Sequence, residues 1–344
     1  MTAPKLAAAV RAAIAAWKQA TTFDQRKAEI DNPAELGSKL AQEVEIELSK
    51  TGENTMIMRR DALAAPYVHL SSVFQPTDLS DTPEDFIPVP DTDGTILGRA
   101  ATLAVHEFLG METISYASEN DGELFVNLSA QRGNGKKAKK SQSSLRGHTD
   151  AVSFPFKGEL DASNPRIAPS PDIVTLVGLR NPKFVPTTVM ILEDVLAKLS
   201  PHDIQELKKD QYSALSQHTF VEGMKHILGE VHTAIDVPVL KDNVSGTLVR
   251  YSHSSVLPTE PGGAAESASE NFETACNEAS ISVTIEPGDI LLVSNRFCLH
   301  GRGVVGGDVG GESRWILRTY ALDTSDLEEN QRHLGNYPRH VLFP

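Results

Sequence analysis

The first fifty residues carry apolar side chains at the spacing of an α-helix. One stripe runs along residues 4–20, and a similar pattern recurs over residues 34–48, so both segments are predicted to be amphipathic helices. The first stripe consists of Leu6, Val10, Ile14 and Trp17. Residues 74–94 are instead crowded with Pro and Asp, which predicts a long irregular connection.

From about residue 100 onward, short β-branched and apolar runs alternate with turn signals, as is typical of strands. Predicted strands cover residues 124–128, 173–179, 246–251, 281–285, 290–293 and 315–322. Pro287-Gly288 predicts a type II turn between two of them. Helical patterns interrupt the strands at residues 188–199, from 201 to about 215, and around 221–231. This order predicts a mainly β fold, a sandwich or barrel with helical padding.

Two segments differ from the rest of the chain in composition. Residues 131–146 are basic and contain two glycines, and residues 260–278 are acidic and rich in Gly, Ala and Ser. Both are predicted to be exposed loops. The basic segment lacks the spacing of a phosphate-binding P-loop. Because a strand with candidate ligands follows it directly, we expect a mobile flap beside a site.

Composition and charge narrow the classes of function. The chain has 344 residues, and 32 Lys and Arg against 46 Asp and Glu give a formal net charge of −14. It therefore lacks the basic face that nucleic acid or an anionic membrane would require, and neither partner is expected. Two cysteines, Cys276 and Cys298, are too few for a disulfide scaffold, and no run of about 18 apolar residues could span a bilayer. These features indicate a cytoplasmic protein.

Three residues have the chemistry of an iron site. His148 and Asp150 are two positions apart, so on a strand their side chains would project to the same side. His300 follows an apolar strand far along the chain. Two imidazoles and one carboxylate form the facial triad of non-haem Fe(II), which leaves coordination positions open.

Two arginines lie just beyond this candidate ligand. Arg314 and Arg318 are four residues apart and so share one face of the strand predicted there. An arginine in a buried strand needs an anion, and its planar fork binds carboxylates through two hydrogen bonds. The alternative is a pair of internal salt bridges to Asp or Glu.

Together these residues resemble the Fe(II)/2-oxoglutarate oxygenases, specifically the clavaminate-synthase-like branch related to taurine dioxygenase. The likeness covers roughly residues 100–322. It implies a double-stranded β-helix, a cupin-like jelly roll with helices packed outside it. We expect one oxygenase domain over residues 1–344: a helical and loop region at 1–99, a jelly-roll core at 100–322 with a lid loop at 131–147, and a tail at 323–344.

The resemblance also implies roles for single residues. His148, Asp150 and His300 match the iron ligands, and Arg314 matches the arginine that binds 2-oxoglutarate. Thr187, favoured over Thr188 by its spacing to the end of the following helix, matches the threonine that shares the distal carboxylate. Arg318 matches the arginine that holds the substrate α-carboxylate. Glu119 matches the residue that takes the α-ammonium, with Glu123 as the alternative.

The implied activity uses Fe(II), 2-oxoglutarate and O₂ to oxidise an unactivated C–H bond of a free L-α-amino acid, releasing succinate and CO₂. Residues 252–255 contain no acid where arginine-hydroxylating relatives have one. Because an unpaired buried cation is unfavourable, we expect hydroxylation of a neutral aliphatic side chain. Lysine remains an alternative, as do desaturation and oxidative ring closure of a valine-like substrate. A cupin-like metal-binding protein without oxygenase activity is the rival class.

Overall fold

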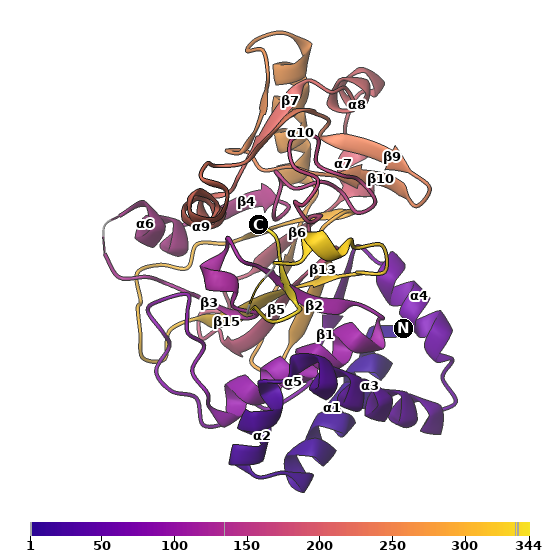
Figure 1. Ribbon diagram of the computed structural model, residues 1–344, viewed down its shortest axis with the longest axis vertical. Helices are drawn as coiled ribbons and strands as arrows, with labels where there is room; N and C mark the ends of the chain where they lie inside the picture. The colour runs from indigo at the N-terminus through magenta and orange to yellow at the C-terminus, as the bar shows by residue number, and fades with distance from the viewer. Residues whose placement is uncertain (1, 134, 334, 336) are drawn as a thin grey trace.

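The computed structural model describes residues 2–133, 135–333, 335 and 337–344; for Thr2, Lys136 and Lys137 it describes only the backbone. Five helices near the N-terminus form a layer at one end of the molecule (Figure 1). They are α1 (Thr2–Ala20), α2 (Phe23–Ile30), α3 (Pro33–Lys50), α4 (Thr55–Ala64) and α5 (Asp93–Phe108). Side-chain caps at Thr22, Asn54 and Thr92 start three of them. The helices expected over 4–20 and 34–48 are confirmed, as is the irregular connection over 74–92.

A seven-stranded sheet lies against this helical layer. Its order is β1-β13-β5-β15-β2-β16, and β3 also pairs with β15. The strands are β1 (Tyr67–Leu70), β2 (Glu112–Tyr116), β3 (Val126–Ser129), β5 (Ile173–Arg180), β13 (Ile290–Ser294), β15 (Trp315–Leu322) and β16 (Val341–Leu342). Every pair is antiparallel except β16 with β2.

A four-stranded antiparallel sheet with the order β12-β6-β14-β4 completes the centre of the fold. Its strands are β4 (Leu145–His148), β6 (Thr187–Ile191), β12 (Ser280–Val283) and β14 (Cys298–Arg302). In the register of this sheet, His300 lies opposite both His148 and Val189, and Arg302 lies opposite Thr187.

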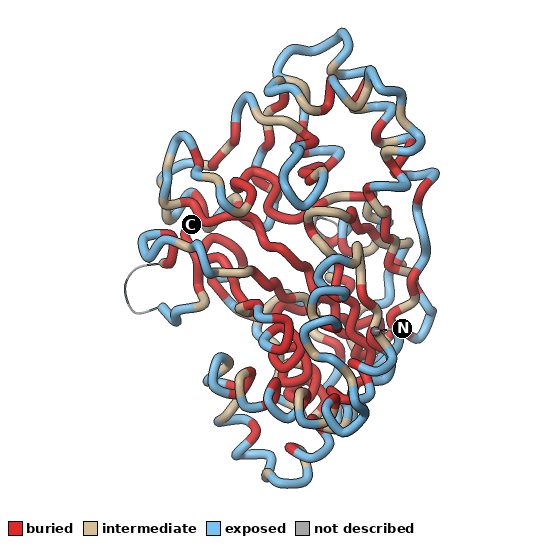
Figure 2. Tube along the Cα trace, turned by 90° about the vertical axis from the view of Figure 1, so that its right-hand side faces the viewer, coloured by how far each residue is buried: buried red, intermediate tan, exposed pale blue. Residues whose placement is uncertain are grey.

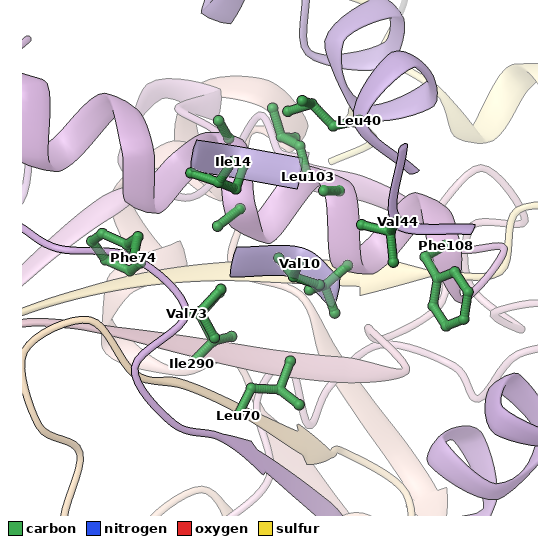
Figure 3. Close-up of a cluster of buried hydrophobic side chains, with 14 of the residues drawn as sticks. Val10, Ile14, Leu40, Val44, Leu70, Val73, Phe74, Leu103, Phe108 and Ile290 are labelled. Atoms are coloured by element: carbon green, nitrogen blue, oxygen red, sulfur yellow. The ribbon is translucent and has the colours of Figure 1, made fainter. Parts of the chain in front are cut away.

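Alternation along the strands divides the core into layers. In β13, Leu291 and Val293 join the cluster that fills the space between the two sheets, whereas Ile290 and Leu292 face the helical layer. Figure 3 shows this second layer, where Val10 of α1 and Val44 of α3 lie above the strands. The red interior of Figure 2 is continuous from the helices through the sheets.

The remaining elements gather mainly at the opposite end of the molecule (Figure 1). They are η1 (Asn120–Gly122), α6 (Lys136–Gln142), α7 (Leu192–Leu196), α8 (Pro201–Leu207), β7 (Tyr212–Leu215), α9 (His218–Leu228), β8 (Thr233–Val237), β9 (Leu240–Asn243), β10 (Gly246–Val249), β11 (Val256–Pro258), α10 (Ala264–Glu278) and η2 (Glu329–Gln331). Helices hold more residues than strands, so the fold is mixed rather than mainly β. No described helix is long and apolar enough to cross a membrane.

Several predicted elements are wrong. The helix expected over 188–199 begins as strand β6, and the helix expected to reach about residue 215 ends at Leu207, before strand β7. β-Branched residues in β6 pair with two neighbouring strands, and this pairing outweighs local helix propensity. The acidic segment expected to be a loop contains α10, because Ala268, Phe272, Ala275 and Cys276 form a buried stripe at helical spacing. The basic segment contains α6 and the start of β4.

Candidate active site

Strands β4 and β14 bring His148, Asp150 and His300 together. One ligand atom from each residue lies within 4.8 Å of the other two. Nε2 of His148 is 3.6 Å from one Asp150 oxygen, and Nε2 of His300 is 3.8 Å from the other. The register of the small sheet explains this meeting, because it sets the two histidines directly opposite each other. Only the position of Asp150 differs from expectation: β4 ends at His148, and the carboxylate reaches the site from the following turn.

Asn295 holds that turn in place. Its side-chain oxygen accepts a hydrogen bond from the Asp150 amide at 2.8 Å, and its nitrogen donates to the carbonyls of Asp150 and Pro171. On the other side, Gln217 accepts from the Ala151 amide and donates to the Thr149 carbonyl. No local sequence pattern points to Asn295 or Gln217, since the turn that each side chain supports is distant in sequence.

Replacing Asn295 with Leu is expected to lower the affinity for Fe(II) by about 10–100-fold, as losses of supporting hydrogen bonds do at metal sites. The variant keeps a similar side-chain volume but releases both backbone groups of Asp150. Titration of the metal, read as a shift in melting temperature, measures the change. Asn181→Leu is the matched control, because Asn181 bonds the Val185 amide and the Val185 and Ile285 carbonyls away from the triad. Equal metal affinity in the two variants would contradict the assignment.

The protonation states suit a metal site. Nδ1 of His148 lies 2.9 Å from the Arg146 carbonyl, a contact that places a proton on Nδ1 and leaves the lone pair of Nε2 directed to the site. Burial lowers the pKa of His300 to about 3, which keeps that imidazole neutral. Burial alone would raise the pKa of Asp150, but the nearby His300, His148 and Arg318 outweigh it and hold the pKa low. Two imidazoles with Nε2 directed to the site or held neutral by burial, and one carboxylate, fit Fe(II).

Arg314 is a buried cation for which the described residues supply no carboxylate within salt-bridge distance. It precedes β15, and the alternation of that strand places it on the same face as Ile316, which lies between the sheets. Burial, together with the charge of nearby Arg302, lowers the pKa of Arg314 to about 9. Since a buried unpaired charge is unfavourable, this position is suited to an anion from solution.

Thr187 lies on the inner face of β6. It has the same strand parity as Val189, which packs between the sheets, whereas Thr188 has the parity of Met190, which packs outside. Thr187 is buried. Of the two threonines considered from sequence, it is the one directed toward the interior.

Arg318 and Glu119 bind each other. The guanidinium donates two hydrogen bonds, of 3.0 and 2.7 Å, to the carboxylate of Glu119, and Nη1 lies 4.0 Å from Asp150. Both residues are buried or nearly so, whereas Glu123 is exposed. The internal salt bridge weighed for the two arginines is therefore present for Arg318 and absent, among the described residues, for Arg314.

A cavity of about 730 Å³ lies elsewhere, between the N-terminal helices and the hairpin of β9 and β10. None of the triad residues lines it. Four of its charged residues form two ion pairs, Arg296 with Asp172 and Lys157 with Asp323. It therefore does not extend the site around His148.

Comparisons with known proteins agree with this architecture. No protein-family model matches the chain. An L-lysine 3-hydroxylase of Catenulispora acidiphila is 22% identical over 231 residues, which cover 66% of this chain and 60% of that relative.

Two solved structures cover nearly the whole chain. One is an asparagine oxygenase in complex with Fe(II), 2S,3S-3-hydroxyasparagine and succinate, with a TM-score of 0.74, 18% identity, and coverage of 98% of this chain and 97% of that one. The other is the non-heme iron oxygenase OrfP in complex with Fe and alpha-ketoglutaric acid, with a TM-score of 0.73, 18% identity and the same coverage. The chain therefore shares the fold of the amino-acid-binding iron oxygenases that its sequence resembles.

Proposed function

We propose that this protein is an Fe(II)/2-oxoglutarate-dependent oxygenase that hydroxylates a C–H bond of a free L-α-amino acid and releases succinate and CO₂. Two observations carry the proposal: a His-Asp-His cluster is present, and a buried arginine lacks a carboxylate partner among the described residues. Strand alternation directs His300 and this arginine to the side of their strands that faces the space between the two sheets. A metal-binding protein without oxygenase activity would need the cluster but would have no use for Arg314.

We also interpret the two central sheets as a double-stranded β-helix within one domain spanning residues 1–344. The order β3-β15-β5-β13 in one sheet and β4-β14-β6-β12 in the other supports this interpretation. The chain alternates between the sheets from β3 to β6 and again from β12 to β15, which is the winding expected of a jelly roll. The tail supports a single domain, because β16 pairs with β2 of the large sheet.

In this proposal different residues bind the metal and the co-substrate. His148, Asp150 and His300 hold Fe(II), which when bound activates O₂ together with 2-oxoglutarate. Arg314 would bind the distal carboxylate of 2-oxoglutarate, and the Thr187 hydroxyl would donate a hydrogen bond to the same carboxylate. The apolar residues between the sheets exclude water around these groups. Arg314 and Thr187 would thus orient the keto acid before the amino acid reacts.

Arg318 and Glu119 serve as the two halves of an amino-acid clamp. An α-amino acid carries one carboxylate and one ammonium, so it can insert between them and give each buried charge a new opposite partner. The pair remains neutral as a whole in both states, which avoids leaving an unpaired charge when the site is empty. The 4.0 Å separation between Arg318 and Asp150 places the clamp beside the metal ligands.

Residues 252–255 bear on which amino-acid side chain the site accepts. Around residues 252–255, Ser252 and Ser255 are buried, and His253 is 2.6 Å from Glu273. With no unpaired acid in that segment, we favour a neutral aliphatic side chain. The similarity to an L-lysine 3-hydroxylase supports lysine as the second candidate.

A panel of free amino acids tests the proposal. The protein is incubated in air with Fe(II), 2-oxoglutarate and each amino acid, and succinate and product masses are recorded. A gain of one oxygen indicates hydroxylation, whereas a loss of two hydrogens indicates ring closure or desaturation. If no amino acid stimulates succinate formation above the background of the protein alone, the proposed function is wrong.

Replacing Arg318 with Met is expected to raise the KM for the amino acid by about 30-fold or more, because truncating one partner of a buried charge pair removes roughly 2–5 kcal/mol of binding. The KM for 2-oxoglutarate should change little. Arg332→Met is the matched control, since Arg332 forms a similar two-bond pair with Glu112 away from the site. Both variants lose a salt bridge, so a rise in amino-acid KM that both share would count against the clamp.

A further inference from the structure

Arg302 is a second arginine directed into the space between the sheets. It is the last residue of β14, and alternation places it on the same face as His300 and Cys298, the latter packed between the sheets. Its register partner on the neighbouring strand is Thr187. Side chains directly opposite on antiparallel strands have Cβ atoms about 4.5–5.5 Å apart, so Arg302 and Thr187 are neighbours.

The end of α6 fixes the orientation of Arg302. One guanidinium nitrogen donates to the carbonyls of Lys140 and Ser143 at 3.0 and 2.8 Å. The following residues, Val305 and Gly306, donate their amides to the Gln142 carbonyl. The last turn of α6 is thereby tied to the end of β14. The partners of this guanidinium nitrogen are neutral carbonyl groups, which leave the positive charge of Arg302 uncompensated.

No carboxylate of the described residues lies within salt-bridge distance of Arg302 or Arg314. Nε of each arginine is buried without a partner among the described atoms. The charge of Arg302 lies close enough to Arg314 to contribute to the lowered pKa of Arg314. The two cations therefore repel each other until an anion comes between them or beside them.

We propose that Arg302 is a positioning residue for the co-substrate. Held by the carbonyls at the end of α6, it lies next to Thr187 and adds a second positive charge to the place where Arg314 binds the distal carboxylate. This inference rests on the proposed function. The extra charge favours a keto acid with a distal carboxylate over one without it. It acts on binding of the co-substrate and leaves the amino-acid clamp and the chemical step unchanged.

The test compares two keto acids of the same chain length, 2-oxoglutarate and 2-oxopentanoate, which lacks the distal carboxylate. Their dissociation constants are measured by calorimetry on the Fe(II)-loaded protein without oxygen. In Arg302→Met, the affinity for 2-oxoglutarate should fall about tenfold or more, in the range seen when groups supporting a site are removed. The affinity for 2-oxopentanoate should change less than about twofold. Arg302→Lys keeps the charge but not the fork, so it should give an intermediate loss.

Kinetics and a control variant exclude a general structural role. Arg302→Met should raise the KM for 2-oxoglutarate while the kcat and the KM for the amino acid stay the same. Arg132→Met should change none of these constants, because Arg132 is an exposed cation in the segment before α6 and is paired with Glu84. Equal losses for both keto acids, or no loss for either, would overturn the inference. If the unaltered protein binds no 2-oxoglutarate at all, the proposed function itself fails.

Discussion

The variant His148→Ala is expected to lose Fe(II) binding and amino-acid-dependent succinate formation together. It removes one of three ligands, and the remaining pair cannot enclose an ion whose open positions are needed for the reaction. The loss should exceed the roughly 10–100-fold that follows removal of a supporting hydrogen bond. Succinate formation and the Fe(II)-dependent rise in melting temperature measure the two effects.

His202→Ala is the control for this experiment, because His202 is exposed on α8, outside the two central sheets. It should bind Fe(II) and turn over normally. A chelator should abolish the activity of the control and leave His148→Ala unchanged, since that variant holds no metal to remove. Full turnover in His148→Ala would refute the assignment of the iron ligands.

The variant Arg314→Met is expected to raise the KM for 2-oxoglutarate by about 30-fold or more. Loss of a buried charge-assisted pair corresponds to roughly 2–5 kcal/mol, and each 1.4 kcal/mol is a factor of ten. The KM for the amino acid should change little, because Arg318 and Glu119 are untouched. Steady-state rates at varied keto acid and amino acid separate the two constants.

The stability of Arg314→Met gives an independent check, because a structural arginine and a co-substrate-binding arginine predict opposite changes in melting temperature. Removing a partner from a structural salt bridge lowers stability, but Arg314 has no carboxylate partner among the described residues and is unfavourably buried. The melting temperature of the ligand-free variant should therefore equal or exceed that of the unaltered protein. Arg60→Met, at an exposed arginine, supplies the baseline. A clear loss of stability in Arg314→Met, with unchanged KM for 2-oxoglutarate, would mean that Arg314 is structural.

Local periodicity was a good guide where an element has one buried face. The stripe of Leu6, Val10 and Ile14 predicted α1, and the run from Trp315 to Leu322 matches β15 at both ends. Periodicity failed for Thr188–Ile191, which is compatible with either a helix or a strand. Only the pairing of β6 with β12 and β14, both distant in sequence, decides that these residues are extended.

The residue types and their spacing were enough to single out His148, Asp150 and His300 as candidate metal ligands and Arg314 and Arg318 as candidate anion-binding residues. They also carried the resemblance to the family. The tertiary structure decided the rest: that Asn295 braces Asp150, that Glu119 and not Glu123 meets Arg318, and that Arg302 lies opposite Thr187. The reason is physical. Which side of an element is apolar depends on neighbouring residues, whereas which side chains meet across a site depends on strand register and on turns held by distant side chains.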